Sequence, residues 1–241
     1  MMRDRKIGFM PQESSATYGG NRLLGAWYER LRKIVLRSPE PATRAFRFMS
    51  RLIEQEFVRS DGGVCLAFAS PEADSASAKA LLMLAYCLRS ELDSRVLIVD
   101  ARLTNQRVGI SGQLGLAHSQ GFAEILREGF DGRESLIHAT PVSGVDVLPA
   151  GDVTGEGKTP MNRVRLVQLI DAARVRYSYV LLQVGSPLRD TRNVMIATES
   201  DAVFLLAEEN LTFMKTLDDC RNVLLKNGVK DVRVVVTGAK P

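Results

Sequence analysis

Short apolar runs alternate with amphipathic segments along most of the chain. GVCLAFAS (63–70) and RVLIVDA (95–101) are almost wholly apolar, as is typical of strands buried on both faces of a sheet. AKALLMLAYCLRSEL (78–92) is long enough for a helix and strongly apolar. This alternation predicts an α/β fold in which helices cover both faces of a parallel sheet. The expected strands are 63–70, 95–101, 145–151, 179–185, 201–208 and 231–238, and the expected helices are 42–58, 78–92, 121–129, 162–177 and 210–228.

The first forty residues have a different pattern. Residues 1–22 are polar, whereas LLGAWYERLRKIVL (23–36) has apolar residues at helical spacing, with Trp27 and Tyr28 on or near the apolar stripe. The segment SPEP (38–41) interrupts the pattern. We therefore expect a basic N-terminal arm and helix in residues 1–41, followed by one α/β domain in residues 42–241.

Charge is concentrated at the amino end of the chain. Residues 1–60 carry 12 Lys and Arg against 6 Asp and Glu, although the whole chain of 241 residues has a formal net charge of only +4. Such a surplus suits an acidic partner, anionic lipid or nucleic acid, and it equally suits a solvated helix face. The candidate interaction residues are Arg30, Arg32, Lys33, Arg44 and Arg47.

Composition indicates a soluble globular protein that stays in the cytoplasm. Hydrophobic residues make up 45% of the chain, but no apolar run approaches the ~18 residues of a membrane span, and the first residues lack the apolar core of a secretory signal. The cysteines, Cys65, Cys87 and Cys220, are far apart and are expected to be buried thiols. His118 and His138 are isolated, so we expect no metal site.

GEGKT (155–159) resembles the end of a phosphate-binding loop. The full motif requires a glycine at position 152, where the chain has Asp152, and Gly151 lies one residue too early. Pro160 follows at once, before the next expected helix. The spacing therefore favours a surface loop.

The turn after the first apolar strand is the better candidate, because nucleotide-binding α/β folds place phosphate there. It reads ASPEADSASAKALLMLAYCLRSELDSRVLIVDARL and resembles the bacterial tyrosine autokinases of capsule and exopolysaccharide synthesis, which are related to cell-division and partition ATPases. TPVSGVDVLPAGDV (140–153) and RYSYVLLQVGSP (176–187) resemble two further segments of these proteins. The resemblance covers roughly residues 42–241 and implies a P-loop NTPase-like fold.

In the register of that family, most nucleotide-binding residues are replaced. Ser70, Pro71 and Asp100 match, but Asp74 and Ala76 occupy glycine positions. The other replacements are Ser77 for the lysine, Ala78 for the magnesium-binding hydroxyl residue, and Arg102 and Gln183 for two aspartates. Magnesium and phosphate need those groups, so we expect a degenerate site with no catalytic residue, no metal and no cofactor. ATP and Mg²⁺ are expected only if Lys79, two residues late, or Lys158 replaces the missing lysine.

Two other family features are altered. The helix that builds a ring of subunits in these kinases reads E-A-x-R-x-x-R, whereas here Arg44 occupies the acidic position and Ser50 the last position, with Arg47 retained. The chain ends VVVTGAKP, without the tyrosine cluster that such kinases phosphorylate.

The resemblance and these losses together favour a non-catalytic autokinase-like protein. It would act at the inner face of the cytoplasmic membrane with a polysaccharide co-polymerase, in exopolysaccharide, capsule or holdfast production, and could form a homo-oligomer. Two alternatives remain: an active ATPase or tyrosine kinase with an unusual loop, and a partition-type DNA-associated ATPase. The last is supported by the basic surplus alone.

Overall fold

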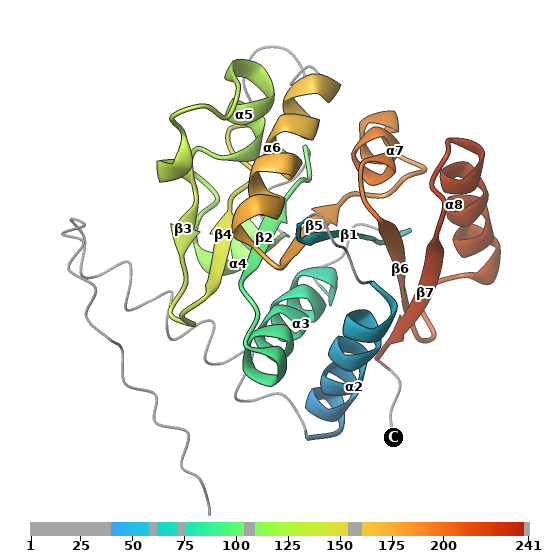
Figure 1. The fold of residues 1–241 in the computed structure, drawn as a ribbon. Helices are drawn as coiled ribbons and strands as arrows, with labels where there is room; N and C mark the ends of the chain where they lie inside the picture. The colour runs from blue at the N-terminus through green and yellow to red at the C-terminus, as the bar shows by residue number, and fades with distance from the viewer. Residues whose placement is uncertain (1–39, 58–61, 72–75, 104–108, 154–160, 239–241) are drawn as a thin grey trace, which may run out of the picture.

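Seven strands form one sheet in the order β3-β4-β2-β5-β1-β6-β7 (Figure 1). The computed structural model describes residues 40–57, 62–71, 76–103, 109–153 and 161–238. The strands are β1 (Val64–Ala69), β2 (Val96–Asp100), β3 (His138–Ala139), β4 (Val145–Leu148), β5 (Tyr179–Val184), β6 (Ala202–Glu208) and β7 (Val232–Thr237). All the pairings are parallel except that of β3 with β4. The predicted α/β fold is confirmed.

The central strands owe their position to their apolar sequences. Every residue of β1, β2 and β5 is buried, as expected of strands covered on both faces. Their register places Asp100 of β2 beside Gln183 of β5, and Gln183 beside Phe68 of β1. Polar side chains at the carboxyl ends of neighbouring strands are thereby brought to one edge of the sheet.

Helices cover both faces of the sheet (Figure 1). One face packs against α5 (Phe122–Glu128), α6 (Arg163–Arg176), α7 (Thr191–Thr198) and α8 (Met214–Lys226) in a single apolar cluster. The opposite face packs against α2 (Glu40–Glu56), α3 (Ala76–Leu92) and α4 (Ile110–Leu114). In the described segments, no helix is both long and apolar enough to cross a bilayer.

Several elements differ from the sequence-based expectation. The sheet is not wholly parallel, because the short strand β3 turns back onto β4 through a hairpin that the Val145 N–H closes by donating to the carbonyl of Val142. Helix α7 was not expected, although Asp190 is an N-cap signal whose side chain accepts a hydrogen bond from the Arg192 N–H. The short helix α4 and the 3₁₀ turn η1 (Glu134–Leu136) were also not predicted from the hydrophobic pattern.

The start of α8 corrects a specific expectation. The helix was expected to begin at residue 210, but it begins at Met214, and Asn210 has a left-handed φ of 63°. Asn is among the residues that tolerate this conformation, which is typical of a turn and not of a helix. Helix α2 likewise begins at Glu40, two residues before the expected domain boundary.

All three cysteines are buried thiols, as predicted. Burial in the apolar interior raises the pKa of the Cys87 thiol and of the Cys220 thiol to about 11 each. The thiolate is the reactive form, and the raised pKa makes it scarce at neutral pH.

We predict that a thiol reagent added to the folded protein at pH 8 labels none of the three cysteines at an appreciable rate. Burial blocks access to all three thiols, and the raised pKa of Cys87 and Cys220 lowers the thiolate fraction of these two about 100-fold. Full labelling is expected after denaturation in guanidinium. Rapid labelling of any cysteine without denaturant, measured by mass spectrometry, would contradict the buried placement.

Candidate functional site

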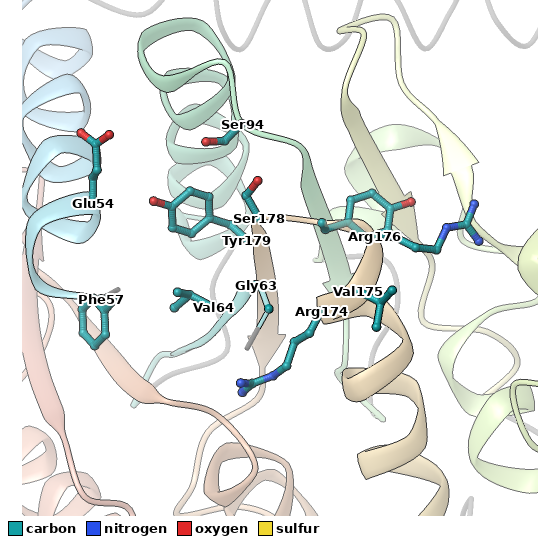
Figure 2. Close-up of a pocket in the computed structure, with 12 residues that line it drawn as sticks. Glu54, Phe57, Gly63, Val64, Ser94, Arg174, Val175, Arg176, Ser178 and Tyr179 are labelled. Atoms are coloured by element: carbon teal, nitrogen blue, oxygen red, sulfur yellow. The ribbon is translucent and has the colours of Figure 1, made fainter. Parts of the chain in front are cut away.

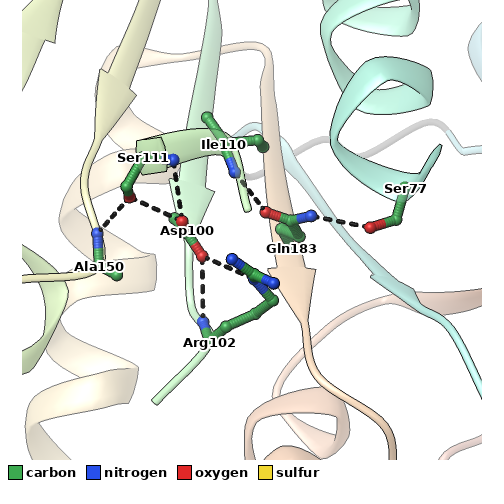
Figure 3. A network of polar contacts seen from close by, with 7 residues as sticks. All are labelled: Ser77, Asp100, Arg102, Ile110, Ser111, Ala150 and Gln183. Atoms are coloured by element: carbon green, nitrogen blue, oxygen red, sulfur yellow. Dashed lines mark hydrogen bonds and ion pairs between the residues drawn. The ribbon is translucent and has the colours of Figure 1, made fainter. Parts of the chain in front are cut away.

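The carboxyl ends of β1, β2 and β5 form the edge where sequence analysis placed the degenerate nucleotide site. Asp100 ends β2, Gln183 lies near the end of β5, and Ser77 lies in the first turn of α3. Each is buried, with Asp100 and Gln183 fully inaccessible to solvent. Figure 3 shows their side chains converging with those of Arg102 and Ser111.

Asp100 is saturated by protein groups. Its Oδ2 accepts hydrogen bonds from the hydroxyl and the backbone N–H of Ser111, at 2.6 and 3.0 Å. Its Oδ1 forms an ion pair with Nε of Arg102 at 3.2 Å (Figure 3). The Ser111 hydroxyl in turn accepts from the Ala150 N–H at 2.9 Å, which connects β2, α4 and the end of β4.

Gln183 connects the other two parts of the site. Its Nε2 donates to the Ser77 hydroxyl at 2.8 Å, and its Oε1 accepts from the backbone N–H of Ile110 at 3.0 Å. An aspartate at this position could not donate to Ser77. The amide therefore suits a site in which side chains bond directly to one another.

Arg102 occupies space that only a glycine leaves open. Its side chain is 8% exposed, and a Cβ built on Gly109 would lie 1.6 Å from the Arg102 Nη2 atom. The guanidinium thus lies against the backbone at the start of α4. A positive charge is thereby fixed beside Asp100.

These contacts leave little for a metal ion to bind. Mg²⁺ is held mainly by carboxylate, hydroxyl and water oxygens. Here the nearest carboxylate is paired with a guanidinium, and Gln183 and Ser77 bond to each other. Among the described residues, no group of three or more His, Cys, Asp or Glu side chains is arranged to hold a metal. The described part of the site does not fit Mg²⁺.

The structure brings together only some of the predicted site residues. Ser70 and Pro71 are buried at the end of β1, and Ala78 is buried on α3. Lys79 is exposed on α3, whereas its neighbours Ser77 and Ala78 face the interior. Asp74, the side chain of Ala76, the GEGKT segment and Lys158 lie outside the described residues.

Two residues of this edge were missed from the sequence. Ser111, which bonds to Asp100, lies in a helix too short to give a periodic signal. Glu124 of α5 is 4% exposed and supports the turn after β4. Its carboxylate accepts from the N–H of Gly121 at 2.6 Å, the N–H of Asp152 at 2.9 Å and Nη2 of Arg127 at 2.5 Å.

Gly151, the last residue of the segment LPAG, lies at a position that requires glycine. This residue has a φ of +83°, and a Cβ there would lie 2.1 Å from the Glu124 Oε2 atom. Position 151 therefore requires glycine both for its backbone conformation and for its close contact with the carboxylate. Glu124 and Gly151 together fix the loop that continues β4, from which Ala150 reaches the Asp100 network.

The candidate basic residues fall into two groups. Arg44 and Arg47 lie on α2, where Arg44 is exposed and Arg47 forms an ion pair with Glu91 of α3 at 3.2 Å. Part of the function of Arg47 is thus to hold α2 on α3. Arg30, Arg32 and Lys33 lie outside the described residues.

A pocket of about 450 Å³ opens at the opposite edge of the sheet, by the amino ends of β1 and β5 (Figure 2). Arg174, one of its lining residues, pairs with Asp201 at 3.0 Å, and Tyr177 donates its hydroxyl to Asp146 at 2.8 Å. Burial is the main cause of the raised pKa of Tyr177. None of the sequence-predicted site residues lines this pocket. Ligands of parallel α/β sheets bind at the other edge, outside the carboxyl ends of the strands.

Solved structures with this fold include kinase domains and partition ATPases. The kinase domain of the Escherichia coli tyrosine kinase ETK has a TM-score of 0.68 at 20% identity, over 88% of this chain and 82% of that one. The VpsO kinase domain gives 0.67 at 21% identity, over 88% and 98%. A ParA family ATPase from Chlorobium tepidum gives 0.59 at 20% identity, over 73% and 74%.

No model of a known protein family and no curated protein matches the chain. The structural similarity establishes that this chain shares the fold of these tyrosine kinase domains and of the ParA family ATPase. It confirms, at the level of the fold, the resemblance found in the sequence.

We predict that Glu124→Gln destabilises the protein by about 1–3 kcal/mol, because the new NH₂ group faces backbone donors that were bonded to a carboxylate. The free energy of unfolding in urea would measure the loss. Glu128→Gln is the matched control on the same helix, since Glu128 is half exposed and only pairs with Arg133 on the surface, a contact worth less than about 1 kcal/mol. Equal losses for the two variants would contradict a structural role for Glu124.

Proposed function

We propose that this chain is a non-catalytic, autokinase-like protein of exopolysaccharide, capsule or holdfast production. It acts on the cytoplasmic face of the membrane with a polysaccharide co-polymerase. Its kinase-like domain serves as an interaction module and takes no part in phosphoryl transfer.

The ion pair between Asp100 and Arg102 carries the proposal. For Asp100 to bind Mg²⁺, the metal would have to displace a buried guanidinium or lie beside its positive charge. Leaving one member of a buried ion pair without its partner costs about 3–5 kcal/mol. Gln183 adds no negative charge to attract the metal, and Ser77 supplies no cation for phosphate.

The polysaccharide pathway is inferred from the kinase-like features. The chain matches the ETK and VpsO kinase domains over 88% of its length, but the ParA family ATPase over 73%. The segment TPVSGVDVLPAGDV, which resembles the autokinases, forms the β4 turn supported by Glu124. The exposed Arg44 and the basic surplus of residues 1–60 suit an acidic segment of a co-polymerase.

The alternative of an active ATPase or kinase depends on Lys79 or Lys158, of which only Lys79 lies among the described residues. Lys79 is exposed on α3, whereas Ser77 of the same helix faces the site and bonds to Gln183. To reach a phosphate at the end of β1, its side chain would have to fold back across its own helix turn. A third possibility, a partition-type protein, would require salt-dependent retardation of DNA.

We predict that the full chain shows no saturable binding of Mg-ATP in calorimetry up to millimolar nucleotide, and no autophosphorylation. The reason is that, in the described site, the Asp100 carboxylate is paired with Arg102 and the Ser77 hydroxyl is bonded to Gln183, while Lys79 is exposed on α3. Micromolar binding that Lys79→Ala abolishes would overturn the proposal in favour of the active alternative. Lys215→Ala is the matched control, because Lys215 is equally exposed but lies on α8.

We also predict that the chain co-sediments with membranes containing a polysaccharide co-polymerase and not with membranes lacking it. Arg44→Glu should weaken this association, and added salt should weaken it further, because contacts between exposed charges are screened. Arg221→Glu, an exposed arginine on α8, serves as the control. Equal binding to both kinds of membrane would argue against the proposed partner.

A further inference from the structure

Helix α2 has two apolar faces, of which only one is covered by the described residues. The covered face contributes Ile53 to the core, with Phe46 and Met49 packed beside it. The other face carries Phe48 and Leu52, whose exposed fractions are 66% and 38%. Phe48 lies in the middle of the helix and is two-thirds exposed, and an exposed apolar face of this kind is typical of an interaction surface.

The exposed apolar face of α2, which we call the outer stripe, consists of Ala45, Phe48 and Leu52. The intervals along it are three and four residues, so the three side chains follow one line along the helix. The neighbouring charges are already engaged. Arg47 pairs with Glu91, and Arg51 pairs with Glu54 and Glu91. These two arginines lie beside the outer stripe, and their charges are balanced by ion pairs within the protein.

The segment just before α2 has a matching pattern. Within residues 23–36, Leu24, Tyr28, Leu31 and Val35 follow one another at intervals of four, three and four residues. Only residues 37–39 separate this segment from α2, which begins at Glu40. Connections of two to five residues are typical of antiparallel helix pairs.

We propose that residues 23–36 form a helix that folds back antiparallel on α2 and covers the outer stripe. A hairpin centred on Ser38 brings together residues whose numbers sum to 76. The resulting pairs are Leu31 with Ala45, Tyr28 with Phe48, and Leu24 with Leu52. Each member of the outer stripe then meets an apolar residue, and the arm becomes a third helix beside α2 and α3.

The lengths and the connection favour this occupant over a second molecule. A helix of fourteen residues spans about 21 Å, and α2, with 17 residues, spans about 25 Å, so the arm is long enough to cover the stripe. A three-residue connection also holds the arm at an effective concentration in the millimolar range, which a separate chain in solution does not reach. The basic residues Arg30, Arg32 and Lys33 are not part of the apolar line and remain available to an acidic partner.

Cysteine cross-linking tests the register directly. The double variant Leu24→Cys/Leu52→Cys should form an intramolecular disulfide under mild oxidation, seen as a faster-migrating monomer on a non-reducing gel. The native thiols are buried and do not interfere. Leu24→Cys/Leu225→Cys is the matched control, since Leu225 on α8 is also 38% exposed, and it should not cross-link.

Trp27, the one tryptophan of the chain, provides a second measurement that needs no disulfide. It lies three residues after Leu24 and four before Leu31, on the same side of the proposed helix, so docking of the arm shields it from solvent. Phe48→Glu should shift its emission to the red and lower the ratio of docked to undocked arm at least tenfold, because an apolar contact is replaced by a buried charge. Val175→Glu, at an 86% exposed site on α6, should leave the emission unchanged.

Three results would overturn the proposal. A disulfide that forms only between chains, in a mixture of tagged and untagged protein, would assign the outer stripe to a second copy. Emission that shifts to the blue only on adding phosphatidylglycerol vesicles would assign the arm to a membrane surface. Solvent-exposed Trp27 together with no cross-link in the full chain would leave the outer stripe uncovered by the arm.

Discussion

The buried carboxylate of Asp100 connects three segments of the chain at one edge of the sheet. It accepts hydrogen bonds from Ser111 at the start of α4 and pairs with Arg102 beyond β2. Through the Ser111 hydroxyl it also reaches the turn after β4. A buried carboxylate is tolerated only when it is paired and fully hydrogen-bonded, so each of these partners depends on the others.

The same network also balances charge at this edge of the sheet. Three carboxylates at positions 100, 102 and 183 would repel one another unless a cation bound between them. In this chain Arg102 supplies a cation from the protein itself, and Gln183 replaces a negative charge by an amide. The edge of the sheet is thereby neutralised internally. A charge balanced by the protein's own groups agrees with the proposed role in interaction.

Surfaces away from this edge then become the more important ones. The region around α2 combines exposed basic residues with the outer stripe, and the basic arm precedes it in the sequence. In residues 23–36, apolar positions recur at helical spacing without a catalytic motif. A binding function in this part of the molecule would leave the kinase-like domain as a rigid support for α2, held by the packing of α2 on α3 and by the pair of Arg47 with Glu91.

The sequence by itself determined the fold class, most helices and strands, and the place of the candidate site, because buried strands and apolar helices have recognisable hydrophobic patterns over short stretches of chain. It also identified Asp100 as a position that matches the kinase-like pattern, and Arg102 and Gln183 as positions that differ from it. Only the tertiary structure decided that these residues bond to one another, that Ser111 and Glu124 complete the edge, and that β3 runs antiparallel. Such contacts join residues distant in sequence, or lie in elements too short for periodicity, and for that reason no local pattern could predict them.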